Sequence, residues 1–182
     1  MPTTSDLIHI HGRPFRRFIS HDEIASVVQR LAQQIDNNHN GERLTLCPVL
    51  TGSYIFAADL SRALQTTHEV RFVQYNSYEG MASTGQVKAR LPFDEQFRNR
   101  HVVIVDDIVE SGLCMSVMLE QLHRFHPASV EVCTLFHKPN LFKQHFKIDY
   151  IGFTIPNDFI VGYGLDYDGL GRQYPDLYIL NE

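Results

Sequence analysis

Residues 101–123 read HVVIVDDIVESGLCMSVMLEQLH, and this stretch decides the fold. Four consecutive β-branched residues at 102–105 are typical of a strand that is buried on both faces. Two acidic residues follow, and Ser111-Gly112 then begins a segment with helical periodicity. The apolar residues that recur at helical spacing are Met115, Met118, Leu119 and Leu122. The stretch therefore predicts a strand, a polar turn and an amphipathic helix.

The same alternation of strand and helix continues on both sides of this unit. Ser20 and Glu23 have the spacing of a capping box and predict the start of a helix that ends at Asn37-Asn38. The other predicted elements are a strand at 44–50, a helix at 54–64, strands at 70–75 and 130–136, and a long, lid-like loop at 76–88. Continuous apolar strands between helices predict an α/β fold with a mainly parallel, twisted sheet flanked by helices.

Length and composition favour one globular domain. The chain has 182 residues, of which 43% are hydrophobic and 20% charged, and it shows neither a repeat nor a low-complexity tract. From residue 149 onward the chain becomes rich in Tyr, Phe, Gly and Asp. We therefore expect a single domain over residues 1–182, with a core at about 20–148 and a small hood at about 149–182 that also takes in N-terminal residues.

Charge and cysteine content exclude several classes of protein. The formal net charge of −5 argues against a nucleic-acid partner. The first residues lack a signal peptide pattern and no apolar run is long enough to span a bilayer, so we expect a cytoplasmic protein with no membrane partner. Three cysteines without CxxC spacing indicate neither a disulfide framework nor a zinc knuckle, and Cys47 and Cys133 are expected in the core. The ten histidines show no paired metal spacing and are expected mostly at the surface.

Residues 106–112 place two kinds of ligand-binding group side by side. The carboxylates of Asp106 and Asp107 suit Mg²⁺ or sugar hydroxyls, whereas the N–H groups at the start of the next helix suit a phosphate. This combination fits a phosphorylated sugar. A solvated acidic loop with Ser111 as a helix cap is the plain structural alternative. A phosphoacceptor domain of the receiver type would need a further Asp after a later strand, for which the sequence has no clear candidate.

The stretch at 103–112 resembles the phosphoribosyl pyrophosphate (PRPP) signature of the type I phosphoribosyltransferases. Four further segments resemble the hypoxanthine-guanine phosphoribosyltransferases in particular, in the same order along the chain. They are the pyrophosphate loop and its helix at 50–60, the lid at 77–85, the purine-contacting segment at 137–139, and the carboxyl-terminal hood at 151–172. The resemblance covers roughly residues 15–180. It implies purine salvage, in which a Mg²⁺-dependent enzyme transfers the 5-phosphoribosyl group from PRPP to hypoxanthine or guanine and gives IMP or GMP and pyrophosphate.

The resemblance also implies a role for each matching residue. Glu110 would be the catalytic base near N7 of the purine, and Ser77 with Tyr78 would form the closing lid. The implied PRPP and 5-phosphate residues are Asp106, Asp107, Ser111, Gly112, Leu113, Cys114 and Met115. The implied pyrophosphate residues are Thr51, Gly52 and Arg172. The implied purine residues are Lys138, Phe159, Ile160 and Asp166. The implied Mg²⁺ ligands are Asp106, Asp107 and Asp166, and the implied assembly is a homodimer or homotetramer.

Several of these residues have structural alternatives. The alternative for Lys138 is an exposed loop lysine, and the alternative for Phe159 is ordinary core. Asp166 has the position to cap the turn around Gly164 and Gly169, and Arg172 to pair with a surface carboxylate.

Four positions depart from the usual family pattern. Thr51 stands where Lys is common in the pyrophosphate loop, Glu110 replaces the common Asp, and Leu113 and Cys114 replace Lys and Thr. We therefore expect weaker phosphate binding and a stronger dependence on Mg²⁺. A catalytically weak regulatory protein that senses PRPP or a nucleotide is the alternative function. The resemblance also implies a cis peptide bond at Leu50-Thr51.

Overall fold

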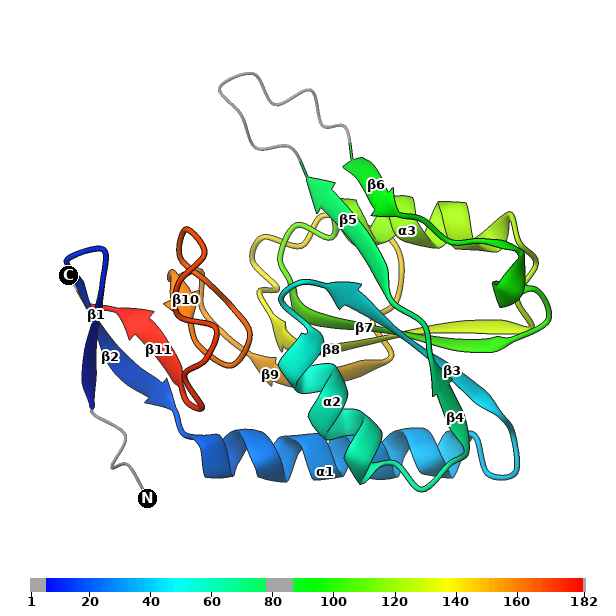
Figure 1. Ribbon diagram of the computed structural model, residues 1–182, viewed down its shortest axis with the longest axis horizontal. Helices are drawn as coiled ribbons and strands as arrows, with labels where there is room; N and C mark the ends of the chain where they lie inside the picture. The colour runs from blue at the N-terminus through cyan, green and yellow to red at the C-terminus, as the bar shows by residue number, and fades with distance from the viewer. Residues whose placement is uncertain (1–5, 78–86, 182) are drawn as a thin grey trace.

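The computed structural model describes residues 6–77 and 87–181, which form a large core sheet with helices on both faces and a smaller hood sheet at one end (Figure 1). Among these described residues, no helix is long and apolar enough to cross a membrane. The predicted α/β fold is confirmed.

The core sheet is parallel except at one edge. It comprises β3 (Leu44–Leu50), β4 (His68–Val70), β5 (Val73–Ser77), β6 (Val87–Leu91), β7 (His101–Val109), β8 (Ser129–His137) and β9 (Tyr150–Thr154). The order is β6-β5-β3-β7-β8-β9, with β4 also paired to β3, and only β6 runs antiparallel to its neighbour. The central strands β3 and β7 are apolar along most of their length because helices cover both faces.

The helices divide between the two faces of the core sheet (Figure 1). The helices are α1 (His21–Asn38), α2 (Tyr54–Ala63), the short 3₁₀ helix η1 (Glu95–Phe97) and α3 (Leu113–His123). In β7, Val103 and Val105 pack into the cluster that contains the apolar faces of α1 and α2. Val102 and Ile104 pack into the cluster that contains α3. Alternate side chains of one strand therefore hold helices on opposite faces.

The first helix begins as predicted. Ser20 is the N-cap of α1, its hydroxyl oxygen accepts a hydrogen bond from the Glu23 N–H, and the Glu23 carboxylate accepts one from the Ser20 N–H. The helix ends at Asn38, where the sequence predicted the stop.

Two element boundaries differ from the prediction. The expected strand at 70–75 is split into β4 and β5 around Arg71 and Phe72. The main-chain groups of even-numbered residues in β3 point toward β4 and β5, since the Leu46 carbonyl accepts from the Arg71 N–H. Pro48 points the same way and has no N–H to donate, so the hydrogen-bond ladder is interrupted there. At the expected loop 76–88, both ends are strand, in β5 and β6, and residues 78–86 lie outside the described residues.

The hood sheet joins the two ends of the described chain. It contains β1 (Leu7–Ile10), β2 (Arg13–Ile19), β11 (Leu177–Leu180) and β10 (Ile160–Val161), in this order. Its neighbouring strands are all antiparallel. Strand β9, which lies beyond the expected boundary at about 149, pairs with β8 in parallel and is part of the core sheet instead. The change in composition at 149 precedes the change of sheet because β9 carries aromatic residues of the core.

The buried sulfur and nitrogen side chains test two further predictions. Cys47 and Cys133 are fully buried free thiols, as predicted. The expectation that the histidines lie mostly at the surface is wrong for His39 and His137, which are both buried.

Candidate active site

The carboxyl ends of β3, β7 and β8 lie next to one another at one edge of the core sheet, where the predicted site residues Thr51, Glu110 and Lys138 follow them. Asp106 and Asp107 lie within β7 itself, which continues to Val109, because β8 runs alongside it and pairs as far as His137. The prediction had ended this strand before the acidic pair. Backbone pairing does not require apolar side chains, so a prediction based on the apolar run alone ended the strand too early.

The two neighbouring carboxylates are half-buried and held by main-chain donors. Asp106 Oδ1 accepts from the Asp107 N–H at 3.1 Å, and Asp107 Oδ1 accepts from the Ile108 N–H at 3.0 Å. Burial and the adjacent carboxylate raise the pKa of Asp106 well above its ordinary value. Burial also raises the pKa of Asp107, although hydrogen bonds and the positive charge of Arg172 oppose it. Two carboxylates in this state favour a cation that relieves their repulsion.

This donor set fits Mg²⁺. The ion prefers hard oxygen ligands and uses one or two carboxylates together with the phosphate oxygens of a substrate. Asp106 and Asp107 provide two carboxylates at the sheet edge. Among the described residues, every buried side-chain N or O atom has a hydrogen-bond partner. These two residues are therefore the candidate Mg²⁺ ligands.

The turn after β3 packs directly against the acidic pair. The Leu50–Thr51 peptide bond is cis, which confirms the prediction. A Cβ atom at Gly52 would lie 1.8 Å from Asp107 Oδ2, so only glycine allows the loop to approach this carboxylate. The side chain of Thr51 is exposed beside this contact.

The hood contacts the same turn through Gly164. This residue has φ +101°, and a Cβ atom on it would lie 2.1 Å from the Gly52 carbonyl oxygen. Arg172 Nη1 donates to the Gly164 carbonyl at 2.6 Å. Tyr163 Oη donates to the Asp59 carboxylate of α2 and fixes the hood to the core. The sequence analysis assigned no role to Tyr163 or Asp59, since an aromatic residue beside a glycine gives no sign of its distant partner.

Gly164→Ala is expected to destabilise the protein and reduce activity together. Gly41→Ala is the matched control, because Gly41 also has positive φ but has no atom near the position of a new Cβ. Both variants introduce backbone strain, and the collision with the Gly52 carbonyl adds about 1–3 kcal/mol to Gly164→Ala. Thermal unfolding and kcat/KM measured for both variants test this. Equal stability of the two variants would show that the close packing of Gly164 against the Gly52 carbonyl does not limit which residue fits at position 164.

The start of α3 presents the backbone N–H groups that the sequence predicts to bind a phosphate. Gly112 is the N-cap with φ +76°, and a Cβ atom there would lie 2.7 Å from the ring of Phe142. The first-turn N–H groups of Leu113, Cys114 and Met115 have no acceptor within the helix and carry its positive dipole end, although the Ser111 hydroxyl oxygen lies 3.4 Å from the Leu113 nitrogen.

Two side chains complete the description of this cradle. Burial, with a smaller contribution from Asp106, raises the pKa of Cys114 to about 12, so its thiol stays neutral at physiological pH. The ring of Phe142 lies against Gly112, and no pattern in the sequence predicts this contact.

Lys138 and Glu110 form an ion pair beside the acidic residues. Lys138 Nζ lies 2.5 Å from Glu110 Oε1, the lysine side chain is 6% exposed, and the glutamate side chain is 48% exposed. The interpretation of Lys138 as an exposed loop lysine is therefore wrong. The Lys138 N–H donates to the Val109 carbonyl, which anchors the residue at the end of β7. A buried cation and an accessible carboxylate are thus in contact with each other at the end of β7.

The hood places an exposed aromatic ring in the predicted purine segment. Phe159 is 44% exposed, so the interpretation of it as ordinary core is wrong. Its ring lies 5.3 Å from the ring of Tyr167 and 6.2 Å from that of Phe15, measured between centroids. Ile160 is buried and pairs with Ile179 of β11. The ring of Phe159 therefore packs against two aromatic residues of the hood and keeps exposed surface for stacking.

Asp166 and Arg172 are joined to each other. Arg172 Nη2 lies 2.6 Å from Asp166 Oδ1, and Asp166 Oδ2 accepts from the Gly169 N–H at 2.7 Å. The alternatives proposed for these residues, a turn cap and a carboxylate partner, are both present. Of the predicted lid, Ser77 is the last residue of β5, and Tyr78 lies outside the described residues.

Comparisons with known proteins identify the family of this chain. A model of the phosphoribosyl transferase domain matches residues 18–168. The hypoxanthine-guanine phosphoribosyltransferase of Mycobacterium avium is 40% identical over 163 residues, which cover 86% of this chain and 79% of that protein. The hypoxanthine phosphoribosyltransferase of Escherichia coli K12 is 39% identical over 156 residues, 84% of this chain and 88% of that one. The crystal structure of a hypoxanthine-guanine phosphoribosyltransferase from Bacillus anthracis matches with a TM-score of 0.86 at 33% identity and covers 91% of this chain and 98% of that one. The chain therefore belongs to the phosphoribosyltransferase family, among its hypoxanthine and hypoxanthine-guanine phosphoribosyltransferases.

Proposed function

We propose that the protein catalyses the Mg²⁺-dependent transfer of the 5-phosphoribosyl group from PRPP to hypoxanthine or guanine and releases pyrophosphate. The observation that carries the proposal is the Lys138–Glu110 pair, a buried donor and an accessible carboxylate 2.5 Å apart, next to the carboxylates of Asp106 and Asp107. The first pair suits the base, and the second suits the sugar and the metal.

The Lys138–Glu110 pair matches one edge of a 6-oxopurine. The O6 and N7 atoms lie next to each other on this edge, where O6 accepts a hydrogen bond. Lys138 Nζ donates to O6, and the Glu110 carboxylate accepts from N7–H, so the two contacts are made side by side. Adenine presents an amino group at this position, which opposes a lysine donor. The arrangement therefore favours oxopurines over adenine.

Glu110 then acts as the general base. As N9 of the purine attacks C1′, the bond between C1′ and the pyrophosphate oxygen breaks, and the proton on N7 passes to the Glu110 carboxylate. The carboxylate of Glu110 follows the end of β7 and is 48% exposed, so a bound base can reach it. Lys138 keeps its contact with O6 and holds the base in register during this step.

The polar groups around the acidic pair bind the other half of the substrate. Asp106 and Asp107 accept hydrogen bonds from the ribose hydroxyls and hold Mg²⁺. Mg²⁺ held there would supply positive charge for the pyrophosphate leaving group. The helix N-terminus at Gly112 receives the 5-phosphate, and Arg172 supplies a cation near the pyrophosphate loop. Asp166, which is already hydrogen-bonded to Arg172 and the Gly169 N–H, is the candidate ligand for a second Mg²⁺.

Product analysis tests the proposal directly. Purified protein is incubated with PRPP, Mg²⁺ and one base at a time, and the nucleotides are separated by chromatography. Hypoxanthine and guanine are expected to give IMP and GMP, and adenine is expected to give no AMP. Formation of AMP at a rate comparable to IMP would contradict the assigned contact between Lys138 and O6.

Phe159→Ala is expected to raise the KM for hypoxanthine by roughly 10-fold while the KM for PRPP stays within about 2-fold, because a stacking ring contributes about 1–3 kcal/mol to the binding of a base. Phe72→Ala is the matched control, since Phe72 is similarly exposed and lies between β4 and β5. Steady-state kinetics with each substrate varied in turn provide the measurement. An unchanged KM for hypoxanthine in Phe159→Ala would remove Phe159 from the purine site.

A regulatory PRPP-binding protein is the second candidate function. The observation in its favour is that Thr51, at the position where a lysine is common, is exposed and uncharged. This candidate predicts measurable PRPP binding without turnover of any base. The intact Lys138–Glu110 pair favours catalysis instead, because a sensor needs no group that accepts a proton from the base.

We propose that the enzyme acts in the cytoplasm and that it forms a homodimer or homotetramer. Light scattering coupled to gel filtration measures the second property.

A further inference from the structure

A cluster of metal-ligating side chains lies at the opposite edge of the core sheet from the active site. His39 follows the end of α1, Glu42 lies in the loop before β3, and His101 is the first residue of β7. Because β3, β7 and β8 are parallel, their amino ends meet at this edge, and His101 pairs with Leu44 on one side and Ser129 on the other. The topology therefore brings together residues that are far apart in the sequence.

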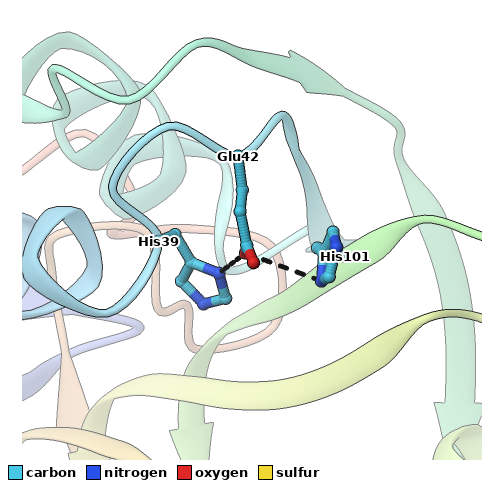
Figure 2. A group of neighbouring side chains, drawn as sticks. All are labelled: His39, Glu42 and His101. Atoms are coloured by element: carbon cyan, nitrogen blue, oxygen red, sulfur yellow. Dashed lines mark hydrogen bonds and ion pairs between the residues drawn. The ribbon is translucent and has the colours of Figure 1, made fainter.

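The three side chains point toward one another (Figure 2). His39 Nδ1 lies 2.7 Å from Glu42 Oε2, and His101 Nδ1 lies 3.6 Å from the same oxygen. All three ligand atoms lie within 4.8 Å of one another. The donor atoms of a tetrahedral zinc site, with bonds of about 2.0–2.1 Å, lie roughly 3.3–3.4 Å apart. The observed spacing brackets this value, and the exposed Glu42 side chain is free to adjust.

The outer contacts of His39 have the form found around metal-ligating histidines. His39 Nε2 lies 2.6 Å from Glu131 Oε2, and the same oxygen accepts from Tyr150 Oη at 2.8 Å. Tyr150 Oη in turn accepts from Asn38 Nδ2 at 2.9 Å. A histidine that ligates a metal almost always donates its other N–H to a carboxylate or carbonyl, which fixes the tautomer and orients the ring. This chain of contacts leaves His39 Nδ1 directed at Glu42 and His101.

Burial and charge also suit a cation. His39 is buried, whereas the side chains of Glu42 and His101 are 41% and 34% exposed, so the cluster combines one buried ligand with two that are accessible to solvent. Glu42 and Glu131 bring two negative charges, which one divalent ion neutralises. Imidazole ligands select zinc and its transition-metal neighbours over Mg²⁺ and Ca²⁺. Ser129 Oγ lies 2.9 Å from the same His101 Nδ1, so this hydroxyl must give up its hydrogen bond when that nitrogen binds the ion.

We propose that His39, Glu42 and His101 bind one Zn²⁺ ion, with water as the fourth ligand and Glu131 as the positioning residue for His39. This site joins the end of α1 to the amino ends of β3 and β7. It is independent of the proposed function because none of its residues reaches the carboxyl edge of the sheet. The competing account is a protonated His39 that bridges Glu42 and Glu131 without any metal.

Cobalt titration distinguishes the two accounts. Co²⁺ replaces Zn²⁺ in such sites and absorbs visible light strongly when it is tetrahedral. The titration is made with excess Mg²⁺ present, which occupies Asp106 and Asp107. We expect one Co²⁺ per chain with a tetrahedral spectrum, and its displacement by one equivalent of Zn²⁺. Zn²⁺ is also expected to raise Tm, because an ion that binds only the folded state stabilises it.

Matched variants locate the binding. Glu42→Gln and His101→Asn change partly exposed residues and are expected to lower Co²⁺ affinity at least about 100-fold, and Glu131→Gln about 10–100-fold. His145→Asn changes an exposed histidine outside the cluster and is expected to bind like the unmodified chain. The proposal is overturned by the absence of a tetrahedral spectrum, or by Glu42→Gln and His101→Asn proteins that remain folded by circular dichroism and bind Co²⁺ as tightly as the unmodified protein.

Discussion

Replacing Asp107 with asparagine is expected to lower kcat/KM for PRPP by roughly 10²–10³-fold, the range found when one preorganised electrostatic contact to a transition state is removed. Asparagine has almost the same shape and still accepts from the Ile108 N–H, so the fold is expected to survive. What is lost is one negative charge next to Gly52 and Arg172, at the place where the metal and the ribose are proposed to bind. Steady-state kinetics with PRPP varied provide the measurement.

Asp22→Asn is the matched control for this variant. Asp22 is exposed in the first turn of α1, far in sequence and structure from the acidic pair, and its loss is expected to leave kcat/KM unchanged. A second measurement is the Mg²⁺ concentration that gives the half-maximal rate, and Asp107→Asn is expected to raise this concentration. An Asp107→Asn protein with normal kcat/KM would mean that this carboxylate binds neither the metal nor the ribose.

Replacing Glu110 with glutamine is expected to lower kcat by about 10²–10⁴-fold, the usual contribution of a general base. Glutamine keeps the length of the side chain and can still accept from Lys138 Nζ, but it does not take up a proton from N7. Because the base and PRPP keep most of their contacts, both KM values are expected to change by less than about 10-fold. Presteady-state and steady-state rates with saturating hypoxanthine and PRPP test this.

Two companion variants separate charge from reach at this position. Glu110→Asp keeps the carboxylate on a shorter side chain and is expected to retain more activity than Glu110→Gln. Glu120→Gln, an exposed glutamate on α3 that pairs with Arg124, is expected to behave like the unmodified protein. If Glu110→Gln turned over hypoxanthine at the normal rate, another group would have to be the base.

Local patterns in the sequence predicted the parts of the fold that local interactions determine. The capping box at Ser20 and Glu23 closes as expected because both partners are three residues apart. The apolar runs at 44–50 and 102–105 form the central strands. A strand with apolar side chains on both faces is buried in a sheet that helices cover on both sides. The strand-to-helix unit at 101–123 therefore sufficed to place the acidic pair and the helix N-terminus at one edge of the sheet.

Features that depend on distant partners escaped the prediction. The burial of Lys138 and its pairing with Glu110 are visible only once β7 and β8 lie side by side. Phe159 stays exposed because Phe15 and Tyr167 fill the hood beneath it, which no local pattern reveals. The roles drawn from the family resemblance remain predictions for the experiments above.

The histidine cluster illustrates the same limit. His39 and His101 are 62 positions apart in the printed sequence, and no short spacing marks them as partners. Only the parallel register of β3, β7 and β8 aligns the amino ends of these strands. A search for paired ligands along the chain therefore predicted scattered surface histidines where the fold builds a compact group.

The bulk charge of −5 also has a structural explanation for an enzyme that uses a polyanionic substrate. The proposed anion contacts are helix N–H groups, Mg²⁺ on Asp106 and Asp107, and two cations, Lys138 and Arg172. With Thr51 uncharged in the pyrophosphate loop, few basic side chains are available to replace the metal. The account therefore requires a strict dependence on Mg²⁺.

Release of pyrophosphate from PRPP, followed with and without Mg²⁺ for hypoxanthine, guanine, xanthine and adenine, tests the central claim most directly. The account predicts rapid release with hypoxanthine or guanine in the presence of Mg²⁺, loss of this release when EDTA removes the metal, and little release with adenine. Binding of PRPP without pyrophosphate release from any base would contradict the account and would identify the protein as a PRPP sensor instead.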